Sequence, residues 1–465
     1  MTNKTTVKAP VLILTLVACA VPAFSQHRSA NEEFTMALTG DSIINRKLSV
    51  YDEPEYLEMI GLLRNADVAF TNLETVLHDY EPYPMAESGG TWMRSDPQMA
   101  HEVAWAGIDM VARANNHTGD YGTLGLELTS KYVEEAGIVH AGAGMSLAEA
   151  REAKFLETSK ARVALISLSS SFASHMRAGR SRDDMPARPG LNPLRLKTTY
   201  VLPEETFNNV RAAADSLGQF TDLDGNPRGT DEDEPGQIDV LGRNFAIGDA
   251  PRIVREPNED DVAEIMAVIN NASRLADFTI VTIHSHQHGG RREIPDNFLP
   301  VFARAAIEAG ADVFVGHGPH ILQGIEIYRG KPIMYSLGNF IFQNETLQRL
   351  PSDNYERYDL NERSHVADFN DARYKNDSTG FPALRENWEA VVAVPRFIDG
   401  ELSELALHPI DLGFGRQRQV RGRPILADEE LGEKIINDLR RLSEPYGTEI
   451  DMRRGVGYVK LGAGN

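Results

Sequence analysis

Two histidines, His317 and His320, stand in the run Gly316-His-Gly-Pro-His320, directly after the apolar stretch Ala311–Val315. Neutral imidazole is the commonest protein ligand of transition metals. The glycines of the run allow a sharp backbone turn, which lets both rings face one point. The spacing therefore predicts a strand that ends in a turn carrying two metal ligands.

Four more polar clusters follow apolar runs in the same way. They are Gly40-Asp41, Asn72-Leu-Glu74, Asn115-Asn116-His117 and His284-Ser-His286-Gln-His288. In open α/β sheets, binding sites collect at the carboxyl ends of the strands. If the apolar runs are parallel neighbours, these carboxylates, carboxamides and imidazoles converge on one place.

Such a mixture of oxygen and nitrogen donors suits zinc, manganese or iron(II), as one ion or two. A divalent ion bound there would lower the pKa of a water molecule and polarise a carbonyl or phosphoryl oxygen. Each cluster taken singly also has a structural interpretation. For example, Asn72 could cap a helix whose first turn favours Glu74. Five clusters in the same position after a strand favour a common metal centre.

Apolar runs alternate with amphipathic segments along the chain. The expected strands are 34–39, 66–70, 110–114, 161–167, 278–283 and 311–315, and the expected helices are 54–65, 97–107, 122–136, 261–275 and 298–309. This alternation is typical of a layered α/β domain. A hairpin over 323–334, two closing strands at 390–394 and 402–407, and an amphipathic helix at 429–442 are expected after them.

Two stretches break the alternation. Residues from about 170 to 260 carry Pro186, Pro189 and Pro193, a helical patch at 204–217 and the acidic run 231–234. They are expected to form a long insertion or lid. The segment 344–386, rich in Asn, Asp, Arg and Tyr, is expected to be irregular. The predicted organisation is a main domain over 31–420 with the insertion inside it, followed by a C-terminal helical extension over 421–465.

The chain has 465 residues and a formal net charge of −21, which argues against nucleic acid as the main partner. Residues 1–25 are expected to be an export signal, because Lys4 and Lys8 precede a short apolar run and small residues follow it. That run is too short to span a bilayer, so no transmembrane segment is expected after signal removal. The single cysteine, Cys19, is either removed or becomes a lipid anchor, since Leu16-Val-Ala-Cys19 resembles a lipoprotein box. Both outcomes predict a periplasmic or extracellular protein.

Together with Ser336-Leu-Gly-Asn339-Phe, the clusters resemble the motif set of the CapA/PgsA family, which is associated with bacterial poly-γ-glutamate capsule synthesis. The resemblance spans about residues 34–343. It implies a four-layer αββα sandwich, similar to the calcineurin-like metallophosphoesterases. The implied metal ligands are Asp41, Glu74, Asn116, His284, His317 and His320. His117 is implied to be the acid that protonates a leaving group, and the neighbouring Asn116 is counted as catalytic with it. Asn72, Asn115 and His286 are implied to bind substrate, and Asn339 to contact substrate or support the ligands.

The sequence departs from this motif set at three points. His284 is followed by Ser-His-Gln-His instead of Trp-Gly, Gly318 replaces a histidine, and Ile43 stands where the phosphoesterase Asp-x-His motif has its histidine. The expected centre therefore holds one ion, or two with His286 or His288 as a replacement ligand. In the insertion, Arg180 and Arg188 are expected to bind an anionic substrate, because guanidinium groups pair with carboxylate and phosphate.

The leading prediction is an exported metal-dependent hydrolase. It would attack an amide bond of γ-glutamyl type, or a phosphoryl group, in an anionic small molecule or a polymer such as poly-γ-glutamate. Two alternatives stay open: a non-catalytic accessory protein for assembly or export of the capsule polymer, and a periplasmic metallophosphoesterase. The absence of Asp-x-His counts against the phosphoesterase.

Overall fold

The computed structural model of the chain describes residues 33–219 and 236–461. The predicted export signal with Cys19, and the acidic run 231–234, lie outside the described residues. Among the helices in the described ranges, none combines the length and apolarity that a bilayer crossing requires.

The larger of the two main sheets has ten strands, eight of them in the order β23-β24-β21-β20-β1-β2-β5-β6. Four neighbours run parallel: β1 (Glu33–Ile43), β2 (Val68–Leu73), β5 (Met110–Ala112) and β6 (Val139–Ala141). On the other side of β1, the long strands β20 (Glu389–Ile398) and β21 (Glu401–Asp411) run antiparallel. The short strand β19 (Asn339–Phe342) pairs with the last residues of β1.

The smaller main sheet has six strands in the order β17-β18-β16-β15-β9-β8. Its four central strands are parallel: β9 (Arg162–Ser169), β15 (Phe278–His284), β16 (Val313–His317) and β18 (Lys331–Met334). Antiparallel strands close both edges, namely β8 (Lys154–Glu157) and β17 (Ile325–Tyr328). The hairpin expected over 323–334 is confirmed as β17 and β18.

Side chains alternate between the two faces of each central strand, and this alternation separates the layers. On β1, Phe34, Met36 and Leu38 face a core that both sheets share, whereas Ala37 faces a second core outside the larger sheet. On β15, Phe278 faces the shared core and Val281 faces a third core outside the smaller sheet. The two sheets are therefore stacked face to face.

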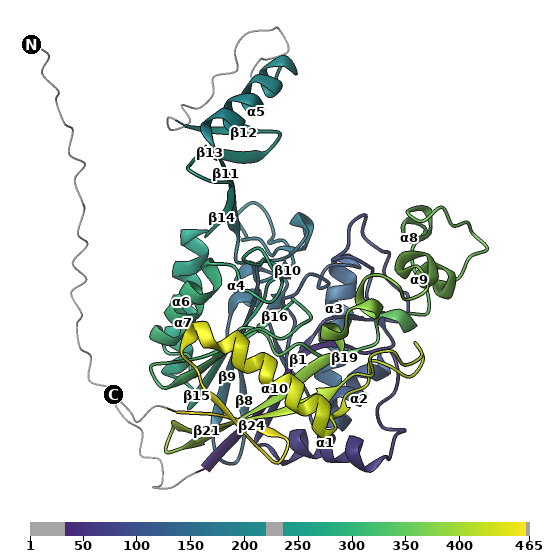
Figure 1. Cartoon of the computed structure of the whole chain (residues 1–465). Coiled ribbons are helices and arrows are strands. Elements are labelled where there is room, and N and C mark those ends of the chain that lie inside the picture. Colours follow the sequence, from purple (N-terminus) through teal and green to yellow (C-terminus); the bar gives the residue numbers. More distant parts are fainter. Residues whose placement is uncertain (1–32, 220–235, 462–465) are drawn as a thin grey trace, which may run out of the picture.

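Helices cover the outer face of each sheet. The larger sheet is covered by α1 (Pro54–Asn65), α2 (Gln98–Ala106) and α3 (Gly122–Glu135). The smaller sheet is covered by α6 (Glu259–Ser273) and α7 (Phe298–Glu308). In Figure 1, α6 and α7 lie to the left of the sheets and α2 and α3 to the right. This packing is a four-layer αββα sandwich, and the α/β fold class expected from the sequence is confirmed.

The C-terminal residues belong to the same sandwich. The amphipathic helix expected at 429–442 is α10 (Glu429–Ser443), and it buries Ile435, Ile436 and Leu439 in the core between the sheets. The hairpin of β23 (Ile450–Arg453) and β24 (Val456–Val459) joins the larger sheet next to β21, which also pairs with β22 (Ile425–Leu426). The region expected as a helical extension thus also contributes strands to the main sheet.

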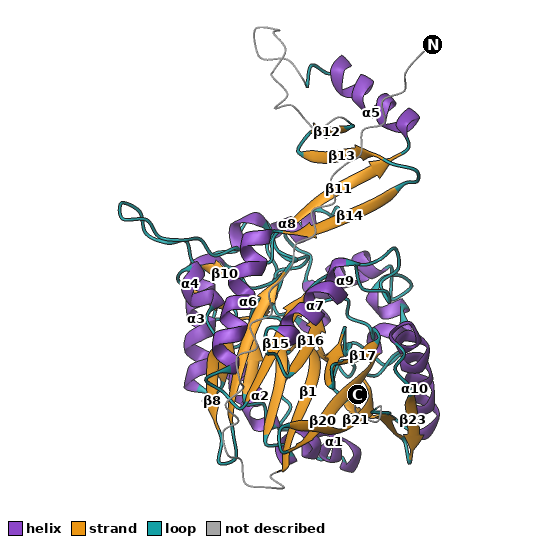
Figure 2. Ribbon diagram, turned by 90° about the vertical axis from the view of Figure 1, so that its left-hand side faces the viewer, coloured by secondary structure: helices purple, strands orange, loops and turns teal. Residues whose placement is uncertain are grey.

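The predicted insertion contains a small sheet of its own. Its four strands lie in the order β12-β13-β11-β14 and α5 (Glu204–Ser216) packs beside them. The strand bounds are β11 (Leu196–Leu202), β12 (Gln237–Val240), β13 (Arg243–Ile247) and β14 (Arg252–Pro257). The unit projects from the top of the sandwich in Figures 1 and 2. Because β11 and β14 pair from Leu196 with Pro257 onward, the chain leaves the sandwich and returns to it at one place.

Shorter elements connect these layers. They are β3 (Val76–Leu77), β4 (Arg94–Ser95), β7 (Ala143–Gly144), β10 (Gly190–Leu191) and α4 (Leu147–Arg151). The segment 344–386, expected to be irregular, contains α8 (Ser352–Glu356), α9 (Val366–Tyr374) and three 3₁₀ turns. It lies beside the carboxyl ends of the central strands, where the polar clusters gather.

Candidate metal centre

The polar clusters from both sheets meet where the parallel strands end. Asp41 on β1 stands opposite Asn72 on β2, and His284 on β15 stands opposite His317 on β16. All four side chains are buried. The register of the strands therefore places a carboxylate and two imidazoles from distant parts of the sequence in one buried group, as the strand-end pattern predicts.

Asp41 lies in the middle of three histidines. Its Oδ1 is 3.5 Å from His317 Nδ1 and 3.8 Å from His284 Nδ1, and its Oδ2 is 3.4 Å from His320 Nδ1. The backbone N–H of Gly318 donates to Oδ2 at 3.1 Å. That approach needs a residue without a side chain, because Gly318 has φ +107° and a Cβ there would meet the Ser285 backbone at 2.9 Å.

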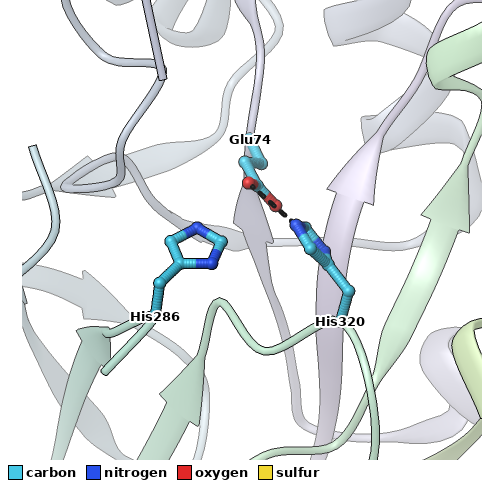
Figure 3. A group of neighbouring side chains, drawn as sticks. All are labelled: Glu74, His286 and His320. Atoms are coloured by element: carbon cyan, nitrogen blue, oxygen red, sulfur yellow. Dashed lines mark ion pairs between the residues drawn. The ribbon is translucent and has the colours of Figure 1, made fainter. Parts of the chain in front are cut away.

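Glu74, just beyond β2, lies on the other side of the imidazoles. Its Oε1 is 3.7 Å from His284 Nε2, 3.7 Å from His320 Nε2 and 3.8 Å from His117 Nε2. Figure 3 shows Glu74, His286 and His320 pointing into a common space. Neither oxygen of Glu74 has a hydrogen-bond partner, although the residue is fully buried. An unpaired buried carboxylate is costly, so the site needs a cation to complete it.

The residues present fit one or two divalent ions. Asp41, Glu74 and His284 form one group whose ligand atoms lie within 4.8 Å of one another, and Glu74, His286 and His320 form a second. Further buried atoms without partners are both ring nitrogens of His317 and the amide oxygen of Asn116. Oxygen and nitrogen donors in this mixture suit zinc, manganese or iron(II). Glu74 is common to both groups and could bridge two ions.

The protonation states of Asp41 and His284 favour ligation, whereas Glu74 must release its proton when a cation binds. Burial would raise the pKa of Asp41, but the neighbouring imidazoles of His317 and His320 outweigh it and hold that pKa well below its ordinary value. Burial, with the neighbouring charges of Asp41 and Asp120, raises the pKa of Glu74 well above its ordinary value. Burial and the nearby His286 lower the pKa of His284 well below its ordinary value. His284 is therefore neutral near pH 7, the form in which imidazole binds a metal.

Three asparagines hold the ligands in place. Asn72 Nδ2 donates to Asp41 Oδ1 at 2.8 Å, and Asn115 Nδ2 in turn donates to Asn72 Oδ1 at 3.3 Å. Asn339 Oδ1 accepts from His320 Nδ1 at 2.9 Å, which leaves Nε2 of that ring facing Glu74. His320 adopts φ +57°, an uncommon backbone conformation for a non-glycine residue that is often found at functional sites. Asn72 and Asn115, which were expected to bind substrate, thus support Asp41 in this structure, and Asn339 supports His320. Contact of these asparagines with substrate stays a prediction.

His117 is oriented by a carboxylate that sequence reasoning missed. Its Nδ1 donates to Asp120 Oδ2 at 2.7 Å, so Nε2 faces Glu74. Asp120 is itself fixed by the backbone N–H groups of Gly89 at 3.0 Å and Met93 at 2.8 Å. The sequence did contain an indication of this partner, because Asp120 follows His117 by three residues, a spacing that one turn of the backbone can bring together.

A family model described as bacterial capsule synthesis protein PGA_cap matches residues 35–344. The chain belongs to this family. An uncharacterized protein of Sinorhizobium fredii, y4sH, is 38% identical over 92% of this chain and 93% of its own length. Capsule biosynthesis protein CapA of Bacillus anthracis is 24% identical over 68% of this chain and 61% of its own. The solved NAD nucleotidase of Haemophilus influenzae is similar over 88% of this chain and 62% of its own, with 10% identity and a TM-score of 0.28.

In this PGA_cap protein, a cavity of about 600 Å³ opens directly above the centre. Asn116, His117, His286, His288 and His320 form its floor and near wall. Much of the remaining wall is contributed by side chains that sequence reasoning did not select: Arg292, Phe342, Asn344, Tyr358, Arg373, Tyr374 and Phe381. Those from Tyr358 onward lie beyond the region that the family model matches. Little in their local sequence marks them, because the segment 344–386 has no strong apolar periodicity.

The two arginines expected to bind substrate lie elsewhere. Arg180 and Arg188 line a separate cavity of about 180 Å³ beside α4 and α6. Arg180 forms an ion pair with Glu264, and Arg188 Nε donates to the carbonyl of Arg177 at 2.9 Å. The structure therefore does not bring either guanidinium to the metal centre, because the loop that carries them, which precedes β11, packs beside α4 and α6.

Proposed function

We propose that this PGA_cap protein is an exported metal-dependent hydrolase. Its substrate would be an anionic molecule or polymer with an amide bond of γ-glutamyl type or a phosphoryl bond. The observation that carries the proposal is the carboxylate of Glu74, which is buried without a hydrogen-bond partner and lies within 4 Å of three imidazoles, two of which line an open cavity. Such a cluster in a cleft is typical of a catalytic site.

The residues that would hold the ions are Asp41, Glu74, Asn116, His284, His286, His317 and His320. Their imidazoles and carboxylates are already turned toward one another, so little reorganisation is needed for ligation. A bound divalent ion supplies Lewis-acid activation of a water nucleophile and of the bond to be cleaved.

His117 would move the proton in the reaction. Asp120 holds the proton of Nδ1, so the second ring nitrogen, Nε2, is left to exchange a proton with the substrate at the cavity floor. We assign to it the protonation of the leaving group, an amine or an alkoxide. Asn116 donates its amide N–H to the carbonyl of Gly89 at 2.8 Å, and its amide oxygen, buried without a hydrogen-bond partner, would be available to an ion.

The capsule link and the location complete the proposal. A relative, CapA of Bacillus anthracis, is named for capsule biosynthesis, and this supports a poly-γ-glutamate type of polymer as the substrate. The basic and apolar start of the sequence supports export. The mass of the mature protein tests the proposed export, because cleavage before Gln26, acylation at Cys19 and an unprocessed chain give three different masses.

The decisive experiment compares the full chain with two variants, His317→Ala/His320→Ala and His117→Asn. We expect elemental analysis to find one or two equivalents of zinc, manganese or iron in the wild type and in His117→Asn, and far less in the double variant. We expect His117→Asn to lose about 10²- to 10⁴-fold in turnover of γ-glutamyl-p-nitroanilide or bis-p-nitrophenyl phosphate.

The possible results separate the function classes. Metal binding with turnover of the anilide supports the amidase, and turnover of the phosphodiester alone supports the metallophosphoesterase. Stoichiometric metal with no turnover of either substrate would favour a non-catalytic accessory role. A wild-type protein that takes up no metal after supplementation would contradict the proposal as a whole.

A further inference from the structure

Two arginines on the cavity wall have no carboxylate partner. Neither Arg292 nor Arg373 forms an ion pair with any carboxylate of the described residues within 4.0 Å, although the chain carries a net charge of −21. Many other arginines of the described chain do form such pairs, for example Arg421 with Glu345. An unpaired guanidinium at the edge of a reaction cavity is free to bind an anion of the substrate.

Arg292 is fixed beside the turn that carries His320. Its guanidinium donates to the carbonyl of Pro319 at 2.7 Å, and its own carbonyl accepts from Gln323 Nε2 at 2.6 Å. Burial lowers the pKa of Arg292, and Glu386 acts on it only from beyond ion-pair distance. The cation is therefore partly removed from water without full neutralisation, which strengthens its attraction for an anion that enters the cavity.

Arg373 is fixed on a different element, at the end of α9. Its guanidinium donates to Thr91 Oγ1 and lies 5.1 Å from the ring centroid of Tyr374. Thr91 and Gly89 belong to one loop, which also binds Asn116 and Asp120. Arg373 is thus held close to the loop that orients His117, while Arg292 is held close to His320.

A neutral polar group lies in the same cavity. Asn344 is buried, donates from Nδ2 to the hydroxyl of Tyr374 at 3.3 Å, and leaves its amide oxygen without a partner. The rings of Phe342 and Phe381, 5.1 Å apart, form an apolar wall next to it. The cavity therefore offers two cations, one unpaired acceptor and apolar surface beside the metal centre.

We propose that Arg292 and Arg373 bind an acidic group of the substrate that is separate from the bond cleaved. This inference rests on the proposed hydrolase function and narrows its substrates to those with such a carboxylate or phosphate. Because Arg373 and Phe381 lie outside the region matched by the family model, the segment 344–386 supplies selectivity to a centre built from the family's motifs.

The test is a binding measurement on the metal-supplemented full chain. Calorimetric titrations would use γ-L-glutamyl-L-glutamate, the same dipeptide with its carboxylates amidated, and inorganic phosphate. Arg292→Gln and Arg373→Gln are expected to weaken binding by about tenfold or more, since each removes a charge-assisted hydrogen-bonding group. Arg373→Lys should recover part of the loss. Arg363→Gln is the matched control, because this exposed arginine of the same segment lies outside the cavity wall.

Arginine-dependent binding of the acidic dipeptide but not of its amide identifies a carboxylate site, and arginine-dependent binding of phosphate identifies a phosphate site. The inference is overturned if the wild type binds neither the acidic dipeptide nor phosphate, or if both glutamine variants bind like the wild type while retaining metal and thermal stability. Arginine-dependent binding without any turnover would refute the hydrolase and leave this inference standing. Turnover by a protein whose affinity for the acidic dipeptide does not depend on the two arginines would refute this inference and leave the hydrolase standing.

Discussion

Glu74 is fully buried, and both of its carboxylate oxygens lack a hydrogen-bond partner. Its pKa in the folded protein is raised by burial and by the charges of Asp41 and Asp120. A carboxyl group whose pKa is raised by folding costs stability once the pH exceeds its pKa in the unfolded chain. The metal-free protein should therefore lose stability as the pH rises through the folded-state pKa of Glu74.

The substitution Glu74→Gln tests this cost. In the presence of a chelator at pH 7 we expect the variant to be more stable than the wild type by about 1–3 kcal/mol, because glutamine removes the cost of either burying the charge or protonating the carboxyl group. Added metal should stabilise the wild type strongly and the variant little. Urea denaturation with and without metal measures both effects, with the exposed Glu135→Gln as control. A variant that is less stable than the wild type under chelation would show that Glu74 is held by the protein itself.

At the residue scale, the sequence located the candidate ligands better than it located the residues of the cavity around them. The polar clusters after apolar runs located Asp41, Glu74, His284, His317 and His320, since strand ends in an α/β sheet meet at one edge. Asp120 was missed, although it lies only three residues after His117. Arg292 and Arg373 were missed because they reach the cavity from loops and short helices whose position depends on tertiary packing.

At the element scale, the close approach of β1 and β19 positions Asp41. The N–H of Asp41 donates to the carbonyl of Gly338 at 3.0 Å, and a Cβ on Gly40 would lie 1.9 Å from that same carbonyl oxygen. No side chain at Gly40 can be tolerated unless the two strands separate. Separation would move Asp41 away from His320, because β19 also carries Asn339, which holds that ring.

We therefore expect Gly40→Ala to destabilise the protein by about 3 kcal/mol or more and to reduce its metal content. Gly61→Ala is the matched control. Gly61 lies inside α1, and its added Cβ would have no neighbour closer than 3.8 Å. That change should stabilise the protein by about 0.5–1 kcal/mol, because alanine is the better helix former. Thermal and chemical unfolding measure the stability of both variants. Equal stability would refute the role given to the close approach of Gly40 and Gly338.

The sequence could predict the helices and strands that bury a regular row of apolar residues on one face. The helix expected over 54–65 is confirmed as α1, which buries Tyr56, Met59, Ile60 and Leu63 on one face. The strands β13 and β14 were not expected, because none of their residues is buried and their sequence has no clear alternation. Helix α9 was not expected for a similar reason, since only Phe369, Asn370 and Tyr374 are buried in it.

At the scale of the whole molecule, the projecting sheet is joined to the sandwich by one two-stranded ribbon. Thr199 on β11 stands opposite Val254 on β14. At the base of the ribbon, Asp261 accepts from Arg195 Nε at 2.7 Å and from Arg151 Nη2 at 3.0 Å. These contacts lie where the ribbon meets the sandwich. The metal centre uses no residue of the projecting sheet.

We expect the protein to survive removal of the projecting sheet. Replacing residues 200–253 with Asn-Gly would close the ribbon with a two-residue turn and keep the ion pair of Arg255 with Asp296. Metal stoichiometry and affinity for the acidic dipeptide should equal those of the full chain. Loss of either property in a folded deletion variant would mean that the insertion acts on the centre.

The position of β1 in the middle of the larger sheet determines when the metal centre can fold. This first described strand lies between β2 and β20, and its last residues pair with β19, so its neighbours come from both ends of the sequence. Residues near 339 and 393 must leave the ribosome before Asp41 is held in place. Such distant pairing is slow to form. The centre is therefore assembled only on a nearly complete chain, and the ions present where folding ends, not where translation begins, decide which metal it receives.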